Sequence, residues 1–508
     1  MNQKLLYGAV APVAAAALVG CGAQPAPKDQ ILEKPNVVFI FADDVNYECL
    51  GALNRDVIHT PNLDKLLARS TQFTHAFNQG AWNGAVSAAS RAMLITGKNL
   101  WNAATYNPYV TELNRPDQWA KGAPALVGVE NKPFETTWPE YMKEAGYDTY
   151  MSGKWHVSKP PQKLFDTVAH VRGGMPQQSQ DCYDRQLVKG QVDKWRPDDT
   201  SYGGYWEGGT HWSEVLTADA LSYIDIATQK DEPFFMYLAS NAPHDPRQSP
   251  EVCLNMYDVE DILVPENFMP IYTYADEIGC GNDLRDEWLA PFPRTEYAVQ
   301  VNRQEYFACI THLDEQVGKI LEALEKSGKM DETYIIFTAD HGLAIGDHGM
   351  LGKQNMYDAS MRMPLFISGP GIPEGQKIDN MVYMQDVMAT TLDLAGSESG
   401  MQHSDFQSLL PLATGATTDS RSAVYGSYLG LQRMVRTDKY KMIIYPNAEV
   451  VRLYDMENDP YEQVDLAGDE ANIPLMKELL VEFKRLQKEV GGDPLDVDPY
   501  FNAYISKL

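Results

Sequence analysis

The stretch NVVFIFADD, residues 36–44, decides the fold that this sequence predicts. Its first seven residues form an apolar run rich in β-branched and aromatic side chains, typical of a strand buried on both faces of an α/β sheet. The run ends in Asp43 and Asp44. Open α/β sheets bind ligands beyond the carboxyl ends of their strands, and adjacent carboxylates repel each other unless a cation joins them. We therefore predict a cation-containing site here, the simpler alternative being a polar loop start.

Further apolar runs follow the same design. We predict strands over residues 147–152, 233–239, 333–338 and 363–368, flanked by helices over 60–67, 137–146, 214–229, 306–326 and 385–394. Polar residues follow three of these strands: Lys154 and His156 follow 147–152, His244 follows 233–239, and Asp340 and His341 follow 333–338. Each of these groups alone is a weak signal, because a loop histidine is more often structural. In one parallel sheet, however, these side chains would meet at one edge.

The stretch SAASRAMLITG, residues 87–97, predicts an anion site beside that edge. Ser87, Ser90 and Arg91 are spaced i, i+3 and i+4, so a helix that begins near Ser87 places them on one face of its first turn. A helix N-terminus offers free N–H groups and partial positive charge, and Arg91 adds a planar cationic donor. The alternative is a surface helix with Ser87 as N-cap and a solvated Arg91.

The same stretch resembles the type I sulfatase signature [CS]-x-P-S-R-x-x-x-L-T-G, from which it departs at Ala89 and Ile95. The resemblance extends over about residues 36–466 and includes TPNLD (60–64), FTHAF (73–77) and YDMENDPYE (454–462). It implies a fold like alkaline phosphatase: a large, mostly parallel sheet flanked by helices, with a smaller C-terminal subdomain of an antiparallel sheet and a helix.

The resemblance also implies a mechanism. Ser87 would be converted to formylglycine, whose hydrate is the nucleophile, and a serine at this position implies a radical-SAM maturase as partner. Lys154, Lys353 and His244 would neutralise the sulfuryl group, His244 would protonate the leaving oxygen, and His156 would help to take the remaining hydroxyl proton. One divalent cation is implied, Ca²⁺ or alternatively Mg²⁺, because oxygen ligands suit a hard ion. The implied catalytic residues are Ser87, Arg91, Lys154, His156, His244 and Lys353, and the implied metal ligands are Asp43, Asp44, Ser87, Asp340 and His341.

The implied activity is removal of O-sulfate from a sulfated carbohydrate, with a terminal galactose or hexosamine of host glycans favoured. His170, Arg172 and Arg247 are candidate sugar contacts, although polar surface residues are the commoner explanation for the first two. Two other functions stay open. One is a metal-dependent phosphatase or phosphodiesterase of the same superfold, which would use an unmodified Ser87 and two metals. The other is a catalytically inactive glycan-binding lipoprotein.

Length and charge bound the remaining choices. At 508 residues the chain can form two cores, and its net charge of −28 argues against nucleic acid or anionic membrane as a partner. Residues 1–20 are typical of a signal peptide, and LVGC, residues 18–21, resembles a lipobox that would leave Cys21 lipidated. We therefore expect a periplasmic or cell-surface protein, held by a lipid anchor to the bacterial outer membrane.

The predicted organisation has four parts: a signal peptide (1–20), a tether (21–35), a catalytic domain (36–398) and a C-terminal subdomain (399–508). The last would contain short strands near 424–428, 432–436, 440–445 and 452–454 and a helix over 472–490. The irregular composition of residues 165–209 predicts an insertion at the substrate mouth. The five cysteines after Cys21 are scattered and odd in number, which favours free thiols and leaves one disulfide open.

Overall fold

The computed structural model describes residues 34–53, 58–106, 132–176 and 179–508. The predicted signal peptide, the lipidated Cys21 and nearly all of the predicted tether lie outside these ranges.

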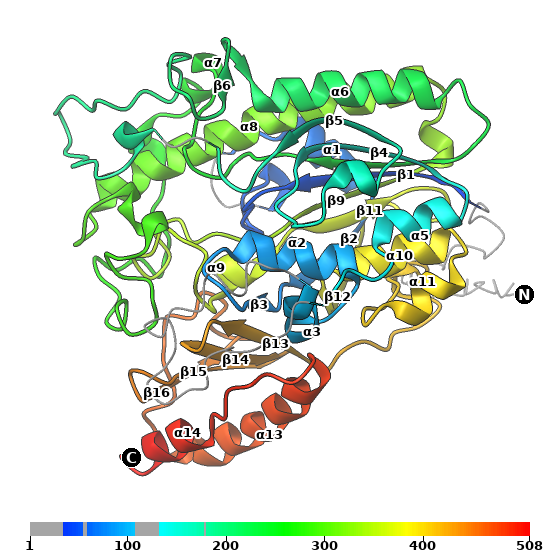
Figure 1. Cartoon of the computed structure of the whole chain (residues 1–508). Coiled ribbons are helices and arrows are strands. Elements are labelled where there is room, and N and C mark those ends of the chain that lie inside the picture. Colours follow the sequence, from blue (N-terminus) through cyan, green and yellow to red (C-terminus); the bar gives the residue numbers. More distant parts are fainter. Residues whose placement is uncertain (1–33, 54–57, 107–131, 177–178) are drawn as a thin grey trace, which may run out of the picture.

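A nine-stranded, mostly parallel sheet forms the middle layer of the larger part of the molecule (Figure 1). Its parallel half contains, in spatial order, β9 (Thr333–Ala339), β1 (Asn36–Ala42), β8 (Phe234–Ala239), β4 (Asp148–Lys154) and β5 (Thr167–Arg172). On the other side of β9 the sheet continues through the antiparallel β11 (Leu365–Ser368) to β2 (Thr71–Phe77), which also pairs with β10 (Arg362–Met363) and β12 (Gln376–Tyr383). The predicted fold class is confirmed.

Helices cover both faces of this sheet (Figure 1). One face carries α1 (Pro61–Ala68), α6 (Trp212–Ala227) and α8 (Glu296–Lys326), and the other carries α2 (Val86–Thr96), α5 (Trp138–Glu144) and α10 (Asp386–Leu394). Helix α8 begins ten residues before the predicted start, and in this added part Ala298 and Val301 belong to a hydrophobic cluster that includes Leu187 and Trp195 of a distant segment. That contact is not visible in the local sequence pattern.

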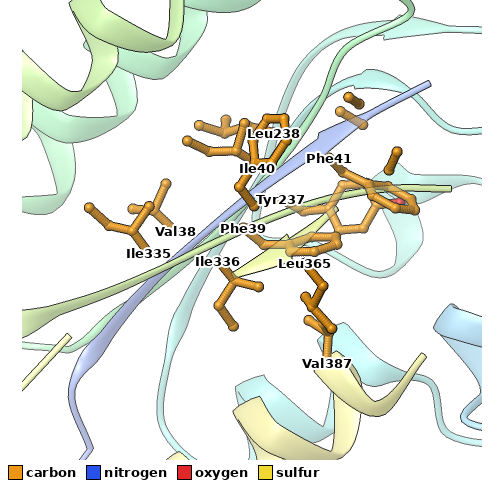
Figure 2. Close-up of a cluster of buried hydrophobic side chains, with 14 of the residues drawn as sticks. Val38, Phe39, Ile40, Phe41, Tyr237, Leu238, Ile335, Ile336, Leu365 and Val387 are labelled. Atoms are coloured by element: carbon orange, nitrogen blue, oxygen red, sulfur yellow. The ribbon is translucent and has the colours of Figure 1, made fainter. Parts of the chain in front are cut away.

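The core lies on both faces of β1 (Figure 2). Val38 and Ile40 point to one face, whereas Phe39 and Phe41 point to the other, as strand alternation requires. The ring of Phe39 lies 5.2 Å from that of Trp138 in α5, measured between centroids. Full burial of one such side chain stabilises the fold by about 1.5–3 kcal/mol, so this strand is strongly held in register.

Three strands of the large sheet were not expected from the sequence, namely β2, β5 and β12. Strand β5 lies inside the segment expected to be an irregular insertion, so that expectation is wrong for residues 167–172. It is a half-exposed edge strand with a single neighbour, and its polar residues interrupt the apolar run that would reveal a buried strand.

A second sheet packs below the first in the view of Figure 1. The predicted antiparallel strands are present as β13 (Ala423–Tyr428), β14 (Gln432–Thr437), β15 (Tyr440–Tyr445) and β16 (Val450–Asp455), with α13 (Ile473–Glu489) and α14 (Asp498–Ile505). This sheet also takes in β3 (Gly80–Ala81), parallel to β13, so it is not built only from residues after 399. Gly80 has φ +89°, and a Cβ there would lie 1.9 Å from the Ser427 carbonyl oxygen, so this junction requires glycine.

Shorter elements complete the described chain: α3 (Leu100–Ala103), β6 (Trp206–Glu207), β7 (Thr210–His211), α7 (Glu251–Leu254), α9 (Asp358–Met361), α11 (Glu398–His403) and α12 (Leu410–Ala413). The five cysteines within the described ranges are buried and free, which confirms the prediction of free thiols. Within the same ranges, no helix combines the length and the apolar character that crossing a bilayer would require.

Candidate active site

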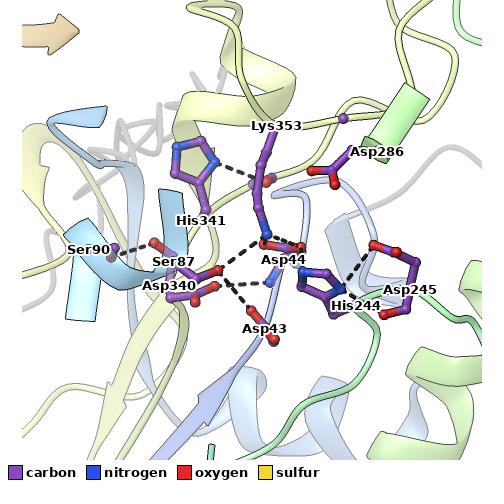
Figure 3. A network of polar contacts seen from close by, with 12 residues as sticks. Asp43, Asp44, Ser87, Ser90, His244, Asp245, Asp286, Asp340, His341 and Lys353 are labelled. Carbon is purple, nitrogen blue, oxygen red and sulfur yellow. Dashed lines mark hydrogen bonds and ion pairs between the residues drawn. The ribbon is translucent and has the colours of Figure 1, made fainter. Parts of the chain in front are cut away.

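The polar side chains expected to meet do so beyond the ends of four neighbouring parallel strands, β9, β1, β8 and β4 (Figure 3). Strand pairing continues one step into the loops, because the amide of Asp340 donates to the Ala42 carbonyl over 3.1 Å and that of Asp43 donates to the Ala242 carbonyl over 3.2 Å. The Asp44 amide then donates to Oδ1 of Asp340, 3.1 Å away. These backbone contacts fix the loops that carry the site.

Three carboxylates converge at this edge. Oxygen atoms of Asp43, Asp44 and Asp340 all lie within 4.8 Å of one another, and the three residues are at most 2% exposed. Asp44 has φ +68°, a left-handed conformation that non-glycine residues seldom adopt. Strain of this kind concentrates at functional sites.

Three cations face these carboxylates. The Lys154 ammonium contacts Asp43, the Lys353 ammonium lies 2.6 Å from Oδ1 of Asp44, and Nε of Arg91 lies 3.0 Å from Oδ2 of Asp340. All of these side chains are almost completely buried. Within the described part of the chain, Nη2 of Arg91 has no hydrogen-bond partner and lies 3.8 Å from Oδ1 of Asp43.

Burial and mutual repulsion shift the acidities of this group. Burial raises the pKa of Asp43 to about 6, with Asp340 adding to the rise, and burial raises the pKa of Asp44 to about 6 against the pull of Lys353. The pKa of Asp340 is lowered, because Arg91 and the two lysines outweigh its burial. Two carboxylates thus hold protons more tightly than usual while their oxygens face one another.

Helix α2 brings Ser87 to the centre of the group. Its N-cap is Ala85, without a side-chain cap, so the reading of Ser87 as an N-cap is wrong. Instead, Oγ of Ser87 donates to Oδ1 of Asp43 over 3.2 Å and accepts from Nζ of Lys353 over 3.2 Å. All eleven residues of the helix are buried, so the reading of Arg91 as solvated is also wrong.

Ser90 and Arg91 face the same edge as Ser87, as their spacing predicts. The Ser90 hydroxyl donates to the carbonyl of Asp340 over 2.7 Å and accepts from Asn78 over 2.8 Å. The side chain of Asn78 also donates to that carbonyl over 2.7 Å. Asn78 was missed in the sequence because a single asparagine after an unrecognised strand carries no pattern.

His244 lies on the opposite side of the carboxylates from α2 (Figure 3). Its Nε2 is 3.6 Å from Oδ2 of Asp44, and its Nδ1 is 2.9 Å from Oδ1 of Asp245. Asp245 had no predicted role, although its position next to His244 could have suggested one. Tyr183 and Arg285, which contact Asp245, come from irregular segments whose sequence gives no such signal.

His156 and His341 complete the predicted set. Burial, and then Lys154, lower the pKa of His156 to about 2. Burial, and then Lys353, lower the pKa of His341 to about 4, and its Nδ1 lies 3.1 Å from the Gly342 carbonyl. His341 is not among the groups whose ligand atoms converge, so its role as a metal ligand stays a prediction that this geometry does not favour.

The three candidate sugar contacts each interact with a side chain outside the carboxylate group. Arg247 is 2% exposed and donates to the Asn302 side chain over 2.9 Å, so its role as a sugar contact stays a prediction that this geometry does not favour. Nη2 of Arg172 pairs with Glu207 at 3.0 Å, and His170, with 61% of its side chain exposed, pairs with Asp219. No described contact joins these residues to the carboxylate group.

The convergent carboxylates fit a hard divalent cation. Their oxygen donors are the type that Ca²⁺ and Mg²⁺ prefer, and three buried carboxylates that face one another repel unless a cation joins them. Asp43, Asp44 and Asp340, with residue 87, are the groups placed to hold such an ion.

The fold is alkaline phosphatase-like, and its site places a hydroxyl between carboxylates and cations at the ends of parallel strands. The chain belongs to the sulfatase family, whose profile matches residues 35–397. A second profile, described as the C-terminal region of N-sulphoglucosamine sulphohydrolase, matches residues 346–489. The protein is therefore a sulfuric ester hydrolase.

Relatives agree with this assignment, and solved structures share the fold. The chain is 26% identical to an N-acetylglucosamine-6-O-sulfatase of Bacteroides thetaiotaomicron, over 95% of this chain and 91% of the relative. It is 27% identical to a sulfatase of Formosa agariphila, over 88% and 87% of the two chains. Its fold matches that of a protein solved with its substrate D-glucosamine-2-N,6-O-disulfate, with a TM-score of 0.67 and 23% identity over 92% of this chain and 100% of the other.

A phosphonate monoester hydrolase of Agrobacterium radiobacter shares the fold with a TM-score of 0.65 and 20% identity, over 90% and 96% of the two chains. The fold alone therefore does not choose between sulfate and phosphorus esters.

Proposed function

We propose that this sulfatase removes O-sulfate from a sulfated carbohydrate, with residue 87 as formylglycine and one divalent cation. The observation that supports this most is the position of Ser87, whose hydroxyl lies between Asp43 and Lys353. Lys154 and Arg91 lie beside the same Asp43 carboxylate. Positive groups that surround a nucleophile in a buried site stabilise charge on a transferring sulfuryl group.

The proposed reaction uses the side chains in the following roles. An oxygen on residue 87 attacks sulfur while the bond from sulfur to the sugar oxygen breaks. The sugar oxygen keeps the electron pair and takes a proton from Nε2 of His244. Lys154 and Lys353 lie beside the attacked group and offset its negative charge.

The hydrate of formylglycine would supply two hydroxyls on one carbon, so that the sulfate carried by one oxygen can be expelled when the other loses its proton and the aldehyde re-forms. His156 is the proposed acceptor of that proton; its lowered pKa keeps the ring neutral, although the same shift makes it a weak base. Asp43, Asp44, Asp340 and residue 87 would hold the divalent cation, Ca²⁺ or Mg²⁺, which would supply Lewis-acid charge stabilisation.

The sugar class rests on the relatives. The N-acetylglucosamine-6-O-sulfatase of Bacteroides thetaiotaomicron aligns over nearly the whole of both chains, which supports a hexosamine, with galactose as the other candidate. The test is to produce the protein with a radical-SAM maturase and measure sulfate released from a panel of sulfated N-acetylglucosamine and galactose isomers. Release from at least one sugar, with formylglycine found in the peptide that contains residue 87, is the expected result.

The phosphatase alternative makes the opposite prediction. It expects an unmodified Ser87, two bound metal ions per chain and phosphate release from esters that exceeds sulfate release. The described residues bring only three carboxylates together at one place, which supports a single ion. The inactive alternative expects the matured protein to bind sulfated glycans without releasing sulfate.

The location forms part of the same proposal. The lipobox-like LVGC before residue 22 supports a protein anchored through Cys21 in the periplasm or on the cell surface. Replacing Cys21 with serine should release the protein from the membrane fraction and abolish its labelling by a fatty acid.

A further inference from the structure

The ring of His244 is held by the residue that follows it. Nδ1 of His244 lies 2.9 Å from Oδ1 of Asp245 and 2.9 Å from the Asp245 carbonyl oxygen. Both contacts are visible in Figure 3 as dashed lines on the side of the ring away from the carboxylate group. Because both partners are acceptors, Nδ1 carries a hydrogen, and Nε2 is the nitrogen that faces the reacting groups.

Asp245 is itself fixed by two segments that are distant in sequence. The hydroxyl of Tyr183 donates to its Oδ2, and Nη2 of Arg285 lies 3.7 Å from its Oδ1. Asp245 is 7% exposed. Although burial opposes ionisation, Arg285 and His244 hold the pKa of this carboxyl well below its usual range. A charged, anchored carboxylate therefore stands behind the histidine.

We propose that Asp245 is a positioning residue, which holds the His244 ring so that Nε2 faces the leaving oxygen of the sulfate ester, and that Tyr183 supports it. This inference rests on the proposed function of His244. The segment around Tyr183 would then help to deliver the proton, acting through Asp245 and His244 and not through contact with the reacting atoms.

The step affected is the breaking of the bond between sulfur and the leaving oxygen. The electron pair goes to that oxygen, and the hydrogen on Nε2 of the doubly protonated His244 ring moves to it, which leaves a neutral ring with its hydrogen on Nδ1. A sugar alkoxide is a poor leaving group and depends on this hydrogen, whereas 4-nitrophenolate leaves readily without it. A misplaced ring should therefore slow sugar sulfates much more than 4-nitrophenyl sulfate.

The test compares Asp245→Asn with the wild-type enzyme on two esters: the sulfated sugar that is hydrolysed fastest in the panel, and 4-nitrophenyl sulfate. We expect kcat/KM to fall roughly 100-fold on the sugar and less than about fivefold on the aryl ester, because general acid catalysis contributes at least about 100-fold. Tyr183→Phe keeps the ring but loses one hydrogen bond, so it should show the same selectivity with a loss of up to about tenfold on the sugar.

Asp286→Asn is the matched control. Asp286 is a buried carboxylate that shares Arg285 with Asp245, but its described hydrogen bonds go to Arg285 and Gln354 and not to His244. Its replacement should affect both esters to the same extent. In a His244→Ala background, Asp245→Asn should cause no further loss on the sugar, because the residue acts through the histidine.

Equal losses on both esters in Asp245→Asn, or a further loss in the His244→Ala background, would overturn the inference while leaving the sulfatase function intact. The proposed function fails in a different way, namely when the matured wild-type protein releases sulfate from no sugar. Circular dichroism and thermal unfolding of Tyr183→Phe and Asp245→Asn separate a folding defect from a loss of positioning.

Discussion

Two buried clusters of opposite charges in this molecule have different designs. The site cluster contains Asp43, Asp44, Asp340, Arg91, Lys154 and Lys353. It lies at the ends of the strands of the large sheet, where loop residues meet the end of β4 and the middle of α2. The interface cluster contains Asp358, Glu462, Arg436 and Lys441, and joins α9 to strands β14 and β15 of the small sheet. In both clusters acids and bases are equal in number and nearly all are buried.

The arrangement of the carboxylates distinguishes the two. In the interface cluster, Lys441 lies between the acids, 2.5 Å from Asp358 and 2.6 Å from Glu462, and the Asp358 amide donates to Glu462 over 2.8 Å. In the site cluster, the three carboxylates face one another, and a hydroxyl stands among them. The first arrangement satisfies its own charges and joins two parts of the fold, whereas the second leaves room for an added cation and a reacting group. Charge burial by itself therefore does not mark an active site.

The largest expected effect comes from Ser87→Ala. Removing the oxygen that becomes the nucleophile should lower turnover by at least about 10,000-fold, because a nucleophile deletion removes the covalent step. The side chain makes only two long hydrogen bonds, so unfolding free energy should change by less than about 2 kcal/mol. Turnover and thermal unfolding measured on one preparation check both statements, and substantial residual turnover would contradict the role of residue 87.

Removing the metal sharpens the comparison. Chelation should abolish turnover and destabilise the protein, because an ion at 100 times its Kd stabilises the folded state by about 3 kcal/mol. Adding Ca²⁺ should restore turnover and stability to the wild type and to the interface-cluster variant Lys441→Met. It should not restore them to Asp340→Asn, since Asp340 belongs to the convergent carboxylates. Titration calorimetry gives the stoichiometry, and Ca²⁺ binding that survives in Asp340→Asn would place the ion elsewhere.

Lys441→Met tests the interface cluster. Leaving Asp358 and Glu462 without their shared cation should destabilise the fold by about 3–5 kcal/mol, measured by denaturant unfolding. Turnover per folded molecule should change by less than about twofold, because the two clusters share no partners. Adding Glu462→Gln should recover part of the lost stability, and a failure to recover any would mean that the buried charge is not the cause.

The smallest effect concerns pH. Burial raises the pKa of Glu462 from 4.5 to about 7, so between these values the folded state holds a proton that the unfolded state has released. The free energy of unfolding should therefore fall as pH rises from 5 to 7, and this slope should be absent in Glu462→Gln. We expect the difference between the two proteins to change by roughly 1–3 kcal/mol over this window, since one pKa unit corresponds to about 1.4 kcal/mol. Parallel stability curves would contradict the assignment of this proton to Glu462.

The sequence predicted the site cluster better than the irregular segments. Strand β1 has the predicted bounds, and Asp43, Asp340 and Lys154 lie together at the ends of predicted strands. These strands could be predicted because apolar runs that are buried on both faces have a clear sequence pattern. Strand β5 was missed because a half-exposed edge strand lacks that pattern. The contacts of Arg247 with Asn302 and of Asp245 with His244 were not predicted, because whether a residue after a strand faces the site or the protein interior depends on the path of its loop.

The sequence by itself determined five apolar strands of the large sheet, the polar residues at their ends and the family signature around Ser87, since periodicity and spacing are local properties of the chain. Only the tertiary structure decided that three carboxylates converge within 4.8 Å, that Arg247 packs on Asn302 and that Tyr183 anchors Asp245 behind His244. These facts depend on contacts between segments up to several hundred residues apart. Such contacts arise from packing of the whole core and leave no signal in a local stretch of sequence.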